Sequence, residues 1–374
     1  MRIDRVVFVA ISEVLGGGEL YLLRTARAAT RLVDVAVAGA PDTPVVNEAK
    51  GLGLPTVELE LGRKLGRATA ASNALRYPRA RLRLRSFVDR AAGDWTLLQY
   101  KWEELLWAGA VARDRVALWE HGPIPEPLMR LRWSRRRLAN AFTEAAQVFA
   151  WSRPARDSIL RLWGRSPVML AGGVDPARVA DAIGQRDAVR ASMGVADHEL
   201  LLVYAGRLAE DKGPAAAVGA LRELPDARLV ICGDGPMQAE LPALAARLGL
   251  ANRVHLAGFV PDPFPYLAAG DVTLLLTRSP GEGRPLTAVE SSALGTPVLG
   301  LAGAAAMEEL ADEGRARLVE SDDPGTVARA TIELVQQPRR RVQTPSWDET
   351  AATFLHTLAA IEASATTSGV NPFA

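Results

Sequence analysis

Cysteine is almost absent from this sequence, because Cys232 is the only one among 374 residues. A single thiol excludes a disulfide framework, and its place in the apolar run LVICG predicts a small residue of the core. The apolar run near the start of the chain is too short for a signal peptide or a membrane-spanning helix. Together these absences favour a reducing, cytoplasmic location.

Lysine is scarce as well. The chain has four lysines against forty arginines, and Lys212 is the only lysine after residue 101. This rarity makes a purely solvated role for Lys212 less attractive. Histidine occurs four times, and the motif Asp-x-Asp does not occur. The missing aspartate pair removes one common way to hold a divalent cation.

The remaining composition is that of a soluble globular enzyme, with 48% hydrophobic and 23% charged residues and a length sufficient for two domains. The formal net charge of +1 hides an asymmetry. Residues 1–186 carry 29 basic and 19 acidic side chains, a net of +10, whereas the remainder carries 15 basic and 24 acidic side chains, a net of −9. The two halves of the chain therefore differ in the sign of their charge.

Residues 63–90 hold much of the basic excess, with nine basic side chains against the single acid Asp89. One interpretation is a pair of solvated, arginine-rich helices. The other is a basic face for a phosphorylated, anionic or membrane-bound acceptor. Nucleic acid is a weaker candidate partner, because aromatic residues are not interleaved with the basic ones and no known binding module is present.

Strand-like apolar runs alternate with helix-like segments in two series. Alternation of this kind predicts parallel sheets covered by helices on both faces, and hence two α/β domains that face each other across a cleft. The runs are residues 6–10, 32–38, 55–59, 95–99, 116–119 and 147–151 in the first series, and 200–205, 227–232, 253–256, 271–277, 296–300 and 316–320 in the second.

A linker at residues 168–177 separates the two series, and a polar, helical segment at 178–199 follows it. Near the end of the chain, Ser346 and Glu349 have capping-box spacing and predict the start of a helix. The expected organisation is a first domain at 1–172, a second domain at 173–345, a terminal helix at 346–364 and a flexible tail at 365–374.

A glycine cluster, Gly16 to Gly18, follows the first strand-like run, and residues 20–29 have helical character. Strand, glycine loop and helix form a Rossmann-like opening, although the spacing Gly-x-Gly-x-x-Gly is missing. A simple tight turn is one interpretation. The other is that Gly17 and Gly18 let the backbone approach the phosphates of a ligand, because glycine has no Cβ.

His121 follows the strand-like run 116–119. It is therefore expected at the carboxyl end of a strand, where the ligand-binding groups of a parallel sheet gather. A structural histidine, hydrogen-bonded in a turn, is the alternative.

The stretch GEGRPLTAVESSALGTPVL at residues 281–299 carries two carboxylates, Glu282 and Glu290, eight positions apart. Pro285 suits the first position of a helix and Gly295 suits its end. Glu282 is therefore expected in a loop between a buried strand and a helix, and Glu290 about a turn and a half inside that helix. Open α/β sheets bind anionic ligands at such places.

Glu-x7-Glu followed by Gly-Thr-Pro-Val resembles the signature of the retaining glycosyltransferases of family four, which have the GT-B fold. This resemblance is dense in the second half of the chain and thin in the first. It implies an α/β protein with two facing Rossmann-like domains and a C-terminal helix that crosses back to the first domain. Three more pieces match in the family's order: Gly206-Arg207-Leu208 with Lys212-Gly213, then Gly233-Asp234-Gly235-Pro236, then Gly258-Phe259-Val260.

The resemblance also implies roles for single residues. The first domain would hold the acceptor and the second the nucleotide-sugar donor. Arg284 stands where the family often has an aromatic residue, and Pro285 where it often has glycine, so Arg284 could read a carboxylate or phosphate. The implied contacts are Arg207 and Lys212 to the diphosphate, Glu282 and His121 to the donor sugar, Glu290 to the ribose, Phe259 and Val260 to the base, and Gly283, Arg284, Pro285 and Leu286 to the donor as the rest of the loop.

The implied reaction moves a sugar from a UDP- or GDP-sugar to a hydroxyl of a small-molecule, glycan or lipid-linked acceptor, with retention of configuration. Bacterial glycan, glycolipid or natural-product biosynthesis is the implied setting. No cofactor and no metal are expected besides the nucleotide sugar as co-substrate, because basic side chains and helix ends neutralise the diphosphate in this family. A sugar-nucleotide epimerase of the same fold and a catalytically silent sugar-nucleotide binding protein are the alternatives.

Overall fold

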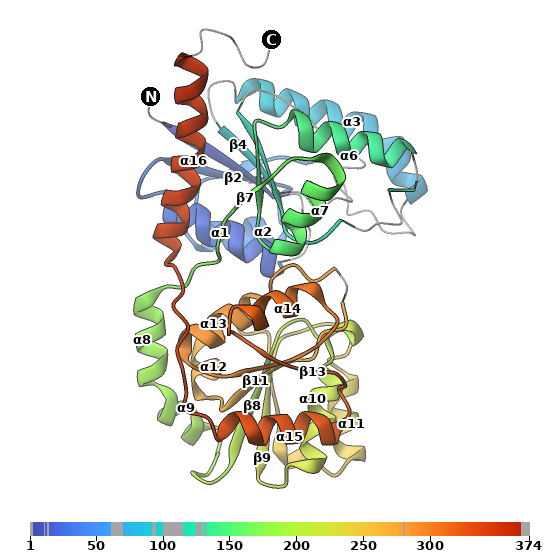
Figure 1. Cartoon of the computed structure of the whole chain (residues 1–374), viewed down its shortest axis with the longest axis vertical. Coiled ribbons are helices and arrows are strands. Elements are labelled where there is room, and N and C mark those ends of the chain that lie inside the picture. Colours follow the sequence, from blue (N-terminus) through green and yellow to red (C-terminus); the bar gives the residue numbers. More distant parts are fainter. Residues whose placement is uncertain are drawn as a thin grey trace. The chain divides into compact units, whose positions relative to one another are not determined.

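The chain forms two compact units in a computed structural model (Figure 1), and each is one parallel sheet with helices on both faces, as the alternation predicts. Unit 1 comprises Met1–Gly172 with Trp347–Ala374, and unit 2 comprises Gly173–Ser346. The structure describes residues 3–10, 12, 15–60, 70–91, 95–99, 115–124, 129–130, 132–279 and 281–367.

The sheet of unit 1 has seven strands in the order β3-β2-β1-β4-β5-β6-β7, all paired in parallel. The central strands β1, β2 and β5 are mainly apolar and buried because both faces of the sheet are covered, whereas the edge strand β3 is Thr-Val-Glu and less buried. Its elements are β1 (Arg5–Ala10), α1 (Gly17–Ala29), β2 (Asp34–Gly39), α2 (Pro44–Gly51), β3 (Thr56–Glu58), α3 (Ala70–Arg90), β4 (Trp95–Gln99), β5 (Val116–Glu120), α6 (Arg132–Glu144), β6 (Gln147–Ala150), α7 (Arg153–Trp163), β7 (Val168–Met169) and α16 (Trp347–Thr367).

Alternate residues of β1 separate the two faces of this sheet. Val7 and Val9 belong to a core cluster with residues of α3, α6 and α7. Phe8, between them, packs on Phe354 of α16, with ring centroids 5.6 Å apart. Helix α16 therefore returns to the first domain, as the resemblance implies.

The sheet of unit 2 has six strands in the order β10-β9-β8-β11-β12-β13, again all parallel. Its elements are α8 (Pro176–Gly184), α9 (Arg186–Ser192), β8 (Leu200–Ala205), the 3-10 turn η2 (Glu210–Lys212), α10 (Pro214–Ala220), η3 (Leu221–Glu223), β9 (Ala227–Cys232), α11 (Glu240–Arg247), η4 (Ala251–Arg253), β10 (Val254–Gly258), α12 (Phe264–Ala269), β11 (Val272–Leu275), α13 (Leu286–Leu294), β12 (Val298–Leu301), α14 (Ala305–Asp312), β13 (Arg317–Val319) and α15 (Pro324–Val335).

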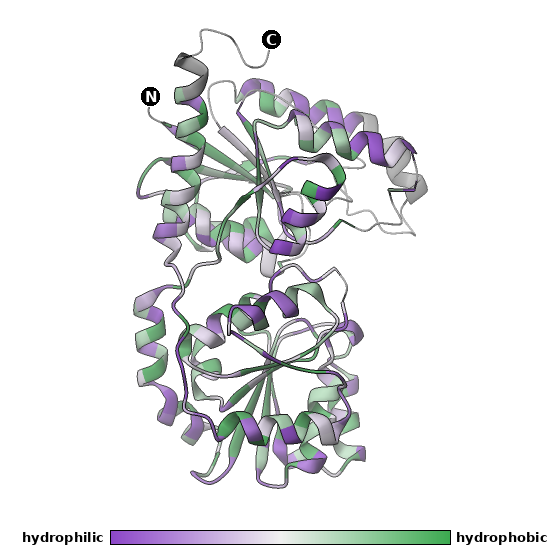
Figure 2. Cartoon of the chain, in the orientation of Figure 1, coloured by the Kyte–Doolittle hydropathy of each residue, from purple (hydrophilic) through white to green (hydrophobic). Residues whose placement is uncertain are grey.

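Two clusters of buried residues lie on opposite faces of this second sheet. Helices α10, α11 and α15 contribute to one cluster, and α8, α12, α13 and α14 contribute to the other. Hydrophobic colour follows the strands in Figure 2. Cys232 is a buried free thiol in one of these clusters, as predicted, and burial raises its pKa to about 12.

Several boundaries differ from the sequence predictions. Helix α13 begins at Leu286, so Pro285 is its N-cap rather than its first helical residue. The polar segment after the linker is two helices that meet at Gln185. Helix α16 starts where Ser346 and Glu349 predict but continues to Thr367, so residues 365–367 of the expected tail are helical and 368–374 lie outside the described residues.

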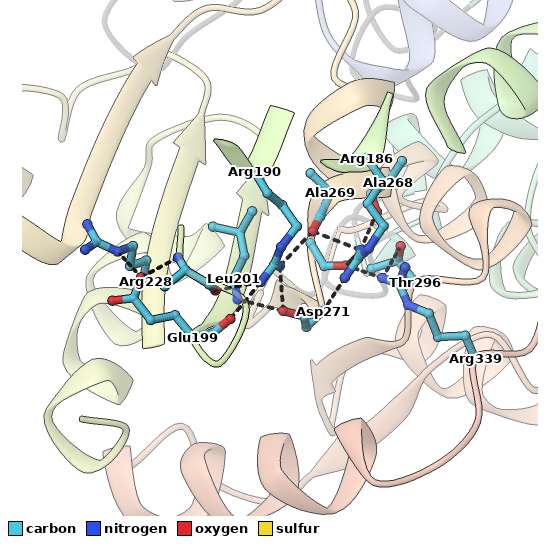
Figure 3. Close-up of polar contacts among 12 residues, drawn as sticks. Arg186, Arg190, Glu199, Leu201, Arg228, Ala268, Ala269, Asp271, Thr296 and Arg339 are labelled. Atoms are coloured by element: carbon cyan, nitrogen blue, oxygen red, sulfur yellow. Dashed lines mark hydrogen bonds and ion pairs between the residues drawn. The ribbon is translucent and has the colours of Figure 1, made fainter. Parts of the chain in front are cut away.

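A network of arginines holds the amino edge of the second sheet (Figure 3). Arg186 and Arg190 both pair with Asp271, at distances of 2.6 and 2.9 Å, and the same carboxylate accepts a hydrogen bond from the backbone N–H of Leu201. Arg186 also donates to the carbonyls that end α12, and Arg339 donates to the last of them, on Gly270. These carbonyls have no partner inside the helix, so the arginines cap it.

Candidate functional site

The loop that follows β8 at the carboxyl edge of the second sheet carries Arg207. The Tyr204 hydroxyl donates a hydrogen bond of 2.8 Å to the carbonyl of Arg207 and fixes the backbone there. The guanidinium of Arg207 is exposed and has no hydrogen bond or ion pair with the residues that the structure describes. The backbone of Arg207 is therefore fixed while its guanidinium has no partner, so this cation is available to an anionic ligand.

Two glycines of the loop after β9 pack directly on this first loop. A Cβ at Gly233 would lie 1.9 Å from the carbonyl oxygen of Gly206, and one at Gly235 would lie 2.5 Å from that of Leu208. Both glycines have a φ near 150°, which other residues rarely adopt. The Gly-Asp-Gly motif therefore brings the β9 loop against the β8 loop, and the next helix, α11, starts at Glu240.

Lys212 and Glu282, seventy positions apart in the sequence, form an ion pair at this edge. Thr277, at the end of the β11 run, donates a hydrogen bond of 3.3 Å to the same Glu282 carboxylate. Gly213 makes the approach feasible, because a Cβ there would lie 2.3 Å from the carbonyl oxygen of Leu276. The structure thus brings together Lys212, which is predicted to bind the diphosphate, and Glu282, which is predicted to bind the sugar.

The electrostatics of the edge reflect this gathering of charges. The pKa of Tyr204 is raised well above its usual range, first by burial and then by the carboxylates of Glu282 and Asp211. Its hydroxyl therefore stays protonated and remains a hydrogen-bond donor at neutral pH.

Helix α13 carries Glu290, whose side chain is 2% exposed. Gly295 ends this helix in the left-handed conformation, as predicted. The hydroxyl of Thr287 donates to the carbonyl of Ala205, the last residue of β8, and so ties the first turn of α13 to the neighbouring strand. The ribose contact of Glu290 stays a prediction.

Phe259 and Val260 follow β10, the strand next to β9. Gly258 accepts a hydrogen bond of 2.7 Å from the backbone N–H of Gly233, so this turn adjoins the Gly-Asp-Gly loop. Phe259 is 54% exposed, whereas Val260 is partly buried against a core cluster. An exposed aromatic ring at the carboxyl edge suits the predicted position beside a base.

Gly283, Arg284, Pro285 and Leu286 complete the loop between β11 and α13. Arg284 does not offer a free cation to a ligand, because its guanidinium donates to Glu309 and Glu313 beside α14. Leu286 is buried and begins the helix. Direct ligand contact by these four residues stays a prediction, and Arg284 is the one whose observed partners point to another role.

Gly17 and Gly18 of the first domain are not a loop but the first turn of α1. Gly16 is the N-cap, and its backbone N–H donates to the Glu19 carboxylate at 3.0 Å, which satisfies that N–H at the start of the helix. A Cβ at Gly17 would meet nothing within 4 Å. Gly17 therefore leaves open space at a helix N-terminus, a place that attracts anions, and the contact of Gly17 and Gly18 with phosphate stays a prediction.

His121 follows β5, as predicted, and lies in a cluster of aromatic rings. Its imidazole stacks on Trp119 at 5.7 Å and meets the edges of Trp151 at 5.1 Å and Tyr21 at 6.5 Å. Its backbone N–H donates to the Glu120 carboxylate at 3.0 Å. The side chain is 8% exposed. These packing contacts fix the ring, and the predicted sugar contact stays a prediction.

Tyr21 connects this cluster to the end of the first domain. Its hydroxyl lies 3.0 Å from the carbonyl oxygen of Leu170 and 2.7 Å from that of Ala171. Thr350 of α16 donates to the same Ala171 carbonyl at 3.1 Å. The segment that leaves the first domain is therefore anchored beside the histidine.

Helix α3 covers the described part of the basic 63–90 stretch, and residues 63–69 lie outside the described residues. One face of the helix, with Leu84, Phe87 and Val88, belongs to the core. Arg83 and Arg85 each have one acidic partner, Glu60 and Asp89, in exposed ion pairs that contribute little to stability. The solvent side carries Arg79, Arg81, Arg83, Arg85 and the exposed Leu82.

Within the described ranges, no group of three or more histidine, cysteine, aspartate or glutamate side chains is arranged to hold a metal ion. None of the described helices is both long and apolar enough to cross a membrane. The absence of a metal requirement stays a prediction.

The sequence analysis missed the residues that contact the predicted site residues and hold them in place. Tyr204 supports the Arg207 backbone, and Thr277 contacts Glu282. Tyr21 and Trp151 enclose His121. Thr277 was the one with a usable signal, because a polar residue ended the apolar run before the glutamate loop.

Comparison with known proteins gives three findings. A family model described as "Glycosyl transferases group 1" matches residues 185–346. A GDP-mannose-dependent alpha-(1-6)-phosphatidylinositol dimannoside mannosyltransferase of Mycobacterium tuberculosis is 34% identical over 183 residues, which cover 44% of this chain and 45% of that protein. A D-inositol 3-phosphate glycosyltransferase of Thermomonospora curvata is 29% identical over 300 residues, covering 70% and 67%.

Among solved structures, Anabaena Alr3699/HepE in complex with UDP superposes with a TM-score of 0.70 at 20% identity and covers 98% of this chain and 100% of that one. The likeness to this structure concerns the fold. By sequence, the chain spans about half the length of the first curated relatives that it matches.

Proposed function

Because this chain belongs, through residues 185–346, to the glycosyl transferases of group 1 and has the GT-B fold, we propose that it is a retaining glycosyltransferase. It moves a hexose from a nucleoside diphosphate sugar to an acceptor hydroxyl. The donor binds at the carboxyl edge of the second sheet, and the first domain takes the acceptor.

The observation that carries the proposal is the meeting of Lys212 and Glu282. These side chains come from two loops, seventy positions apart, and reach the same point at the carboxyl edge of a parallel sheet. The unpaired Arg207 follows β8, which is the strand next to β11. A diphosphate binds to cations, and sugar hydroxyls donate hydrogen bonds to a carboxylate. This edge supplies both kinds of group side by side.

In the proposed mechanism, the bond between the anomeric carbon and the diphosphate oxygen breaks first. Arg207 and Lys212 stabilise the charge that develops on the leaving diphosphate. The acceptor oxygen bonds to the anomeric carbon on the same face, and its proton passes to the departing diphosphate. Glu282 and His121 orient the sugar, while Glu290 holds the ribose. No protein nucleophile is required.

Relatives support both candidate donors. The mycobacterial relative is named for GDP-mannose, whereas the Anabaena structure holds UDP. We therefore keep GDP- and UDP-sugars as the two donors to test. The named acceptors of the relatives, a phosphatidylinositol mannoside and an inositol phosphate, favour an anionic or lipid-linked acceptor for this chain. A cytoplasmic setting, in bacterial glycan, glycolipid or natural-product biosynthesis, accompanies this proposal.

A thermal-shift screen of nucleotide sugars, followed by release of nucleoside diphosphate from each hit, tests the proposal. We expect stabilisation by one donor class and turnover with an acceptor. EDTA leaves turnover intact, because cationic side chains replace a metal at the diphosphate. Complete loss in EDTA that Mn²⁺ or Mg²⁺ restores would contradict the metal-independent mechanism.

The same assay separates the alternatives. A catalytically silent binding protein is stabilised by the donor but releases no diphosphate, alone or with acceptors. An epimerase isomerises or hydrolyses the donor without an acceptor. Acceptor-dependent release with retained anomeric configuration is specific to the proposed transferase.

A further inference from the structure

Arg284 and Glu282 lie two residues apart in the same loop, but their side chains contact different elements. Glu282 reaches Lys212, the last residue of η2, and Thr277, at the end of the β11 run. Arg284 reaches α14 and the residue after it. The loop between β11 and α13 is therefore held from two sides.

The contact of Arg284 is a fork of parallel hydrogen bonds. Its Nη1 and Nη2 donate to the two oxygens of Glu313, at 2.8 and 2.5 Å. Nη1 also lies 3.1 Å from Oε1 of Glu309. A bidentate arginine–carboxylate pair fixes orientation as well as distance. The side chains of Arg284 and Glu309 are 7% and 3% exposed, so a broken pair would leave a buried charge without compensation.

A second arginine extends this anchor to the helix that follows the loop. Arg315 donates from Nε to Glu313 at 2.8 Å, and from Nη1 to the hydroxyl of Ser292 in α13 at 2.9 Å. Burial pushes the pKa of Glu313 upward, but the hydrogen bonds and charges of Arg284 and Arg315 outweigh it and lower that pKa. Glu313 is therefore ionised at neutral pH and binds both arginines.

We propose that Arg284 is a positioning residue, which holds Glu282 in place at the donor site by fixing their common loop to Glu309 and Glu313. This inference deepens the proposed function and rests on the role assigned there to Glu282. It replaces the expectation that Arg284 reads an anionic group of a ligand, because its Nη donors already bind two carboxylates.

The inference separates turnover from nucleotide affinity. A loop released from α14 lets Glu282 drift from the sugar, and a misplacement of about 1 Å can lower turnover about a hundredfold. Arg207 and the Gly-Asp-Gly turn belong to other loops, so affinity for the bare nucleoside diphosphate stays within about twofold of the wild type.

The test compares Arg284→Met with Arg284→Lys and with a matched control, Arg317→Met. Arg317 lies in β13, two strands from β11, and forms an exposed ion pair with Glu333. Three quantities are measured for each variant. They are the kcat and KM for release of diphosphate from UDP-glucose and GDP-mannose, the Kd for UDP and GDP, and amide hydrogen exchange of residues 281–284.

We expect Arg284→Met to lower kcat about a hundredfold with little change in Kd, and to speed amide exchange in the loop. Arg284→Lys keeps one charged contact but loses the fork, so its kcat and exchange rate lie between those of Arg284→Met and the wild type. Arg317→Met behaves as the wild type. If Arg284→Met does not fold, Glu313→Gln, which keeps the shape and removes one charge, must show the same pattern on a smaller scale.

Three results would overturn the inference. One is wild-type turnover in Arg284→Met. Another is lost turnover with unchanged loop exchange, which would mean direct contact with substrate. The third is a rise in KM or Kd without a change in kcat, which would also mean that Arg284 contacts the substrate directly. If the wild type turns over neither donor, the proposed function fails, but the exchange rates still decide whether Arg284 fixes the loop.

Discussion

The amino edge of the second sheet and the loop after β8 at its carboxyl edge use arginine in opposite ways. At the amino edge, Arg186, Arg190 and Arg339 donate to Asp271 or to the carbonyls that end α12. At the carboxyl edge, Arg207 is exposed and has no hydrogen bond or ion pair among the described residues. The difference separates arginines that stabilise the domain from one that is available to a ligand.

Partial burial accompanies this division, because the side chains of Arg186 and Arg190 are 26% and 11% exposed whereas Arg207 is an exposed residue. Burial lowers the pKa of Arg339 to about 10, with the neighbouring charge of Arg186 acting in the same direction, so the amino edge resists further positive charge. The one aspartate there supplies the opposing charge. At the carboxyl edge the counter-charge of Arg207 is left for the ligand to bring, whereas Glu282 supplies that of Lys212, and Glu309 and Glu313 supply that of Arg284. Three predictions, from the largest expected effect to the smallest, test these assignments.

The first prediction is that Asp271→Asn lowers the free energy of unfolding by about 3 kcal/mol, because it leaves two partly buried arginines without their counter-charge. Chemical denaturation of the variant measures the loss. Arg207→Ala, at the other edge, is the control and leaves the free energy of unfolding within about 0.5 kcal/mol. Equal losses in the two variants would contradict the division between the edges.

The same aspartate gives a pH dependence. Burial raises the pKa of Asp271, but the hydrogen bond from Leu201 and the charges of Arg190 and Arg186 outweigh it and hold the pKa below the usual range. A lowered pKa contributes stability that is present at neutral pH and is lost as the pH falls through the folded-state pKa. The stability difference between wild type and Asp271→Asn is therefore constant above about pH 5 and shrinks in stronger acid.

The second prediction concerns the two glutamates of the carboxyl edge. Glu282→Gln lowers turnover of the full donor about a hundredfold while affinity for the bare nucleoside diphosphate changes little. Glu290→Gln instead weakens nucleotide binding, because its proposed partner is the ribose. Turnover and calorimetric affinity in both variants check the assignment, and the reverse pattern would mean that the roles are exchanged.

The third prediction concerns α3 in the first domain. Replacing Arg79, Arg81, Arg83 and Arg85 together by glutamine reduces association with anionic liposomes or raises the acceptor KM, by about three- to tenfold. Affinity for UDP or GDP does not change, because the donor loops belong to the second domain. Unchanged liposome binding and acceptor kinetics would leave α3 as a solvated face only.

Much of the fold follows from the sequence because parallel strands are buried on both faces. Such strands are continuous apolar runs, so β9 was predicted with its exact bounds and β1 within one residue. The glycine motifs were informative for a physical reason: Gly213, Gly233 and Gly235 lie where a Cβ would collide with backbone. The start of α1 was missed: residues 20–29 were predicted to be helical, whereas the helix begins at Gly17, where the backbone N–H of Gly16 donates to Glu19.

The side-chain partners could not be predicted in the same way. Arg284 and Glu313 are 29 positions apart, and Arg186 and Asp271 are 85 apart. Sequence spacing predicts which groups reach an edge, but the direction of a long side chain depends on the helices packed around it. The aromatic rings around His121 come from three elements that only the sheet order brings together.

The most direct test of the central claim is the calorimetric affinity of UDP and GDP for wild type, Arg207→Ala and Lys212→Ala, with Arg317→Ala as the control. The account predicts that the nucleotide bound by the wild type binds each of the first two variants at least about tenfold more weakly, since a charge-assisted hydrogen bond contributes about 1.5–3 kcal/mol. The control keeps wild-type affinity. Unchanged affinity in both Arg207→Ala and Lys212→Ala would contradict a diphosphate site at the carboxyl edge of the second sheet.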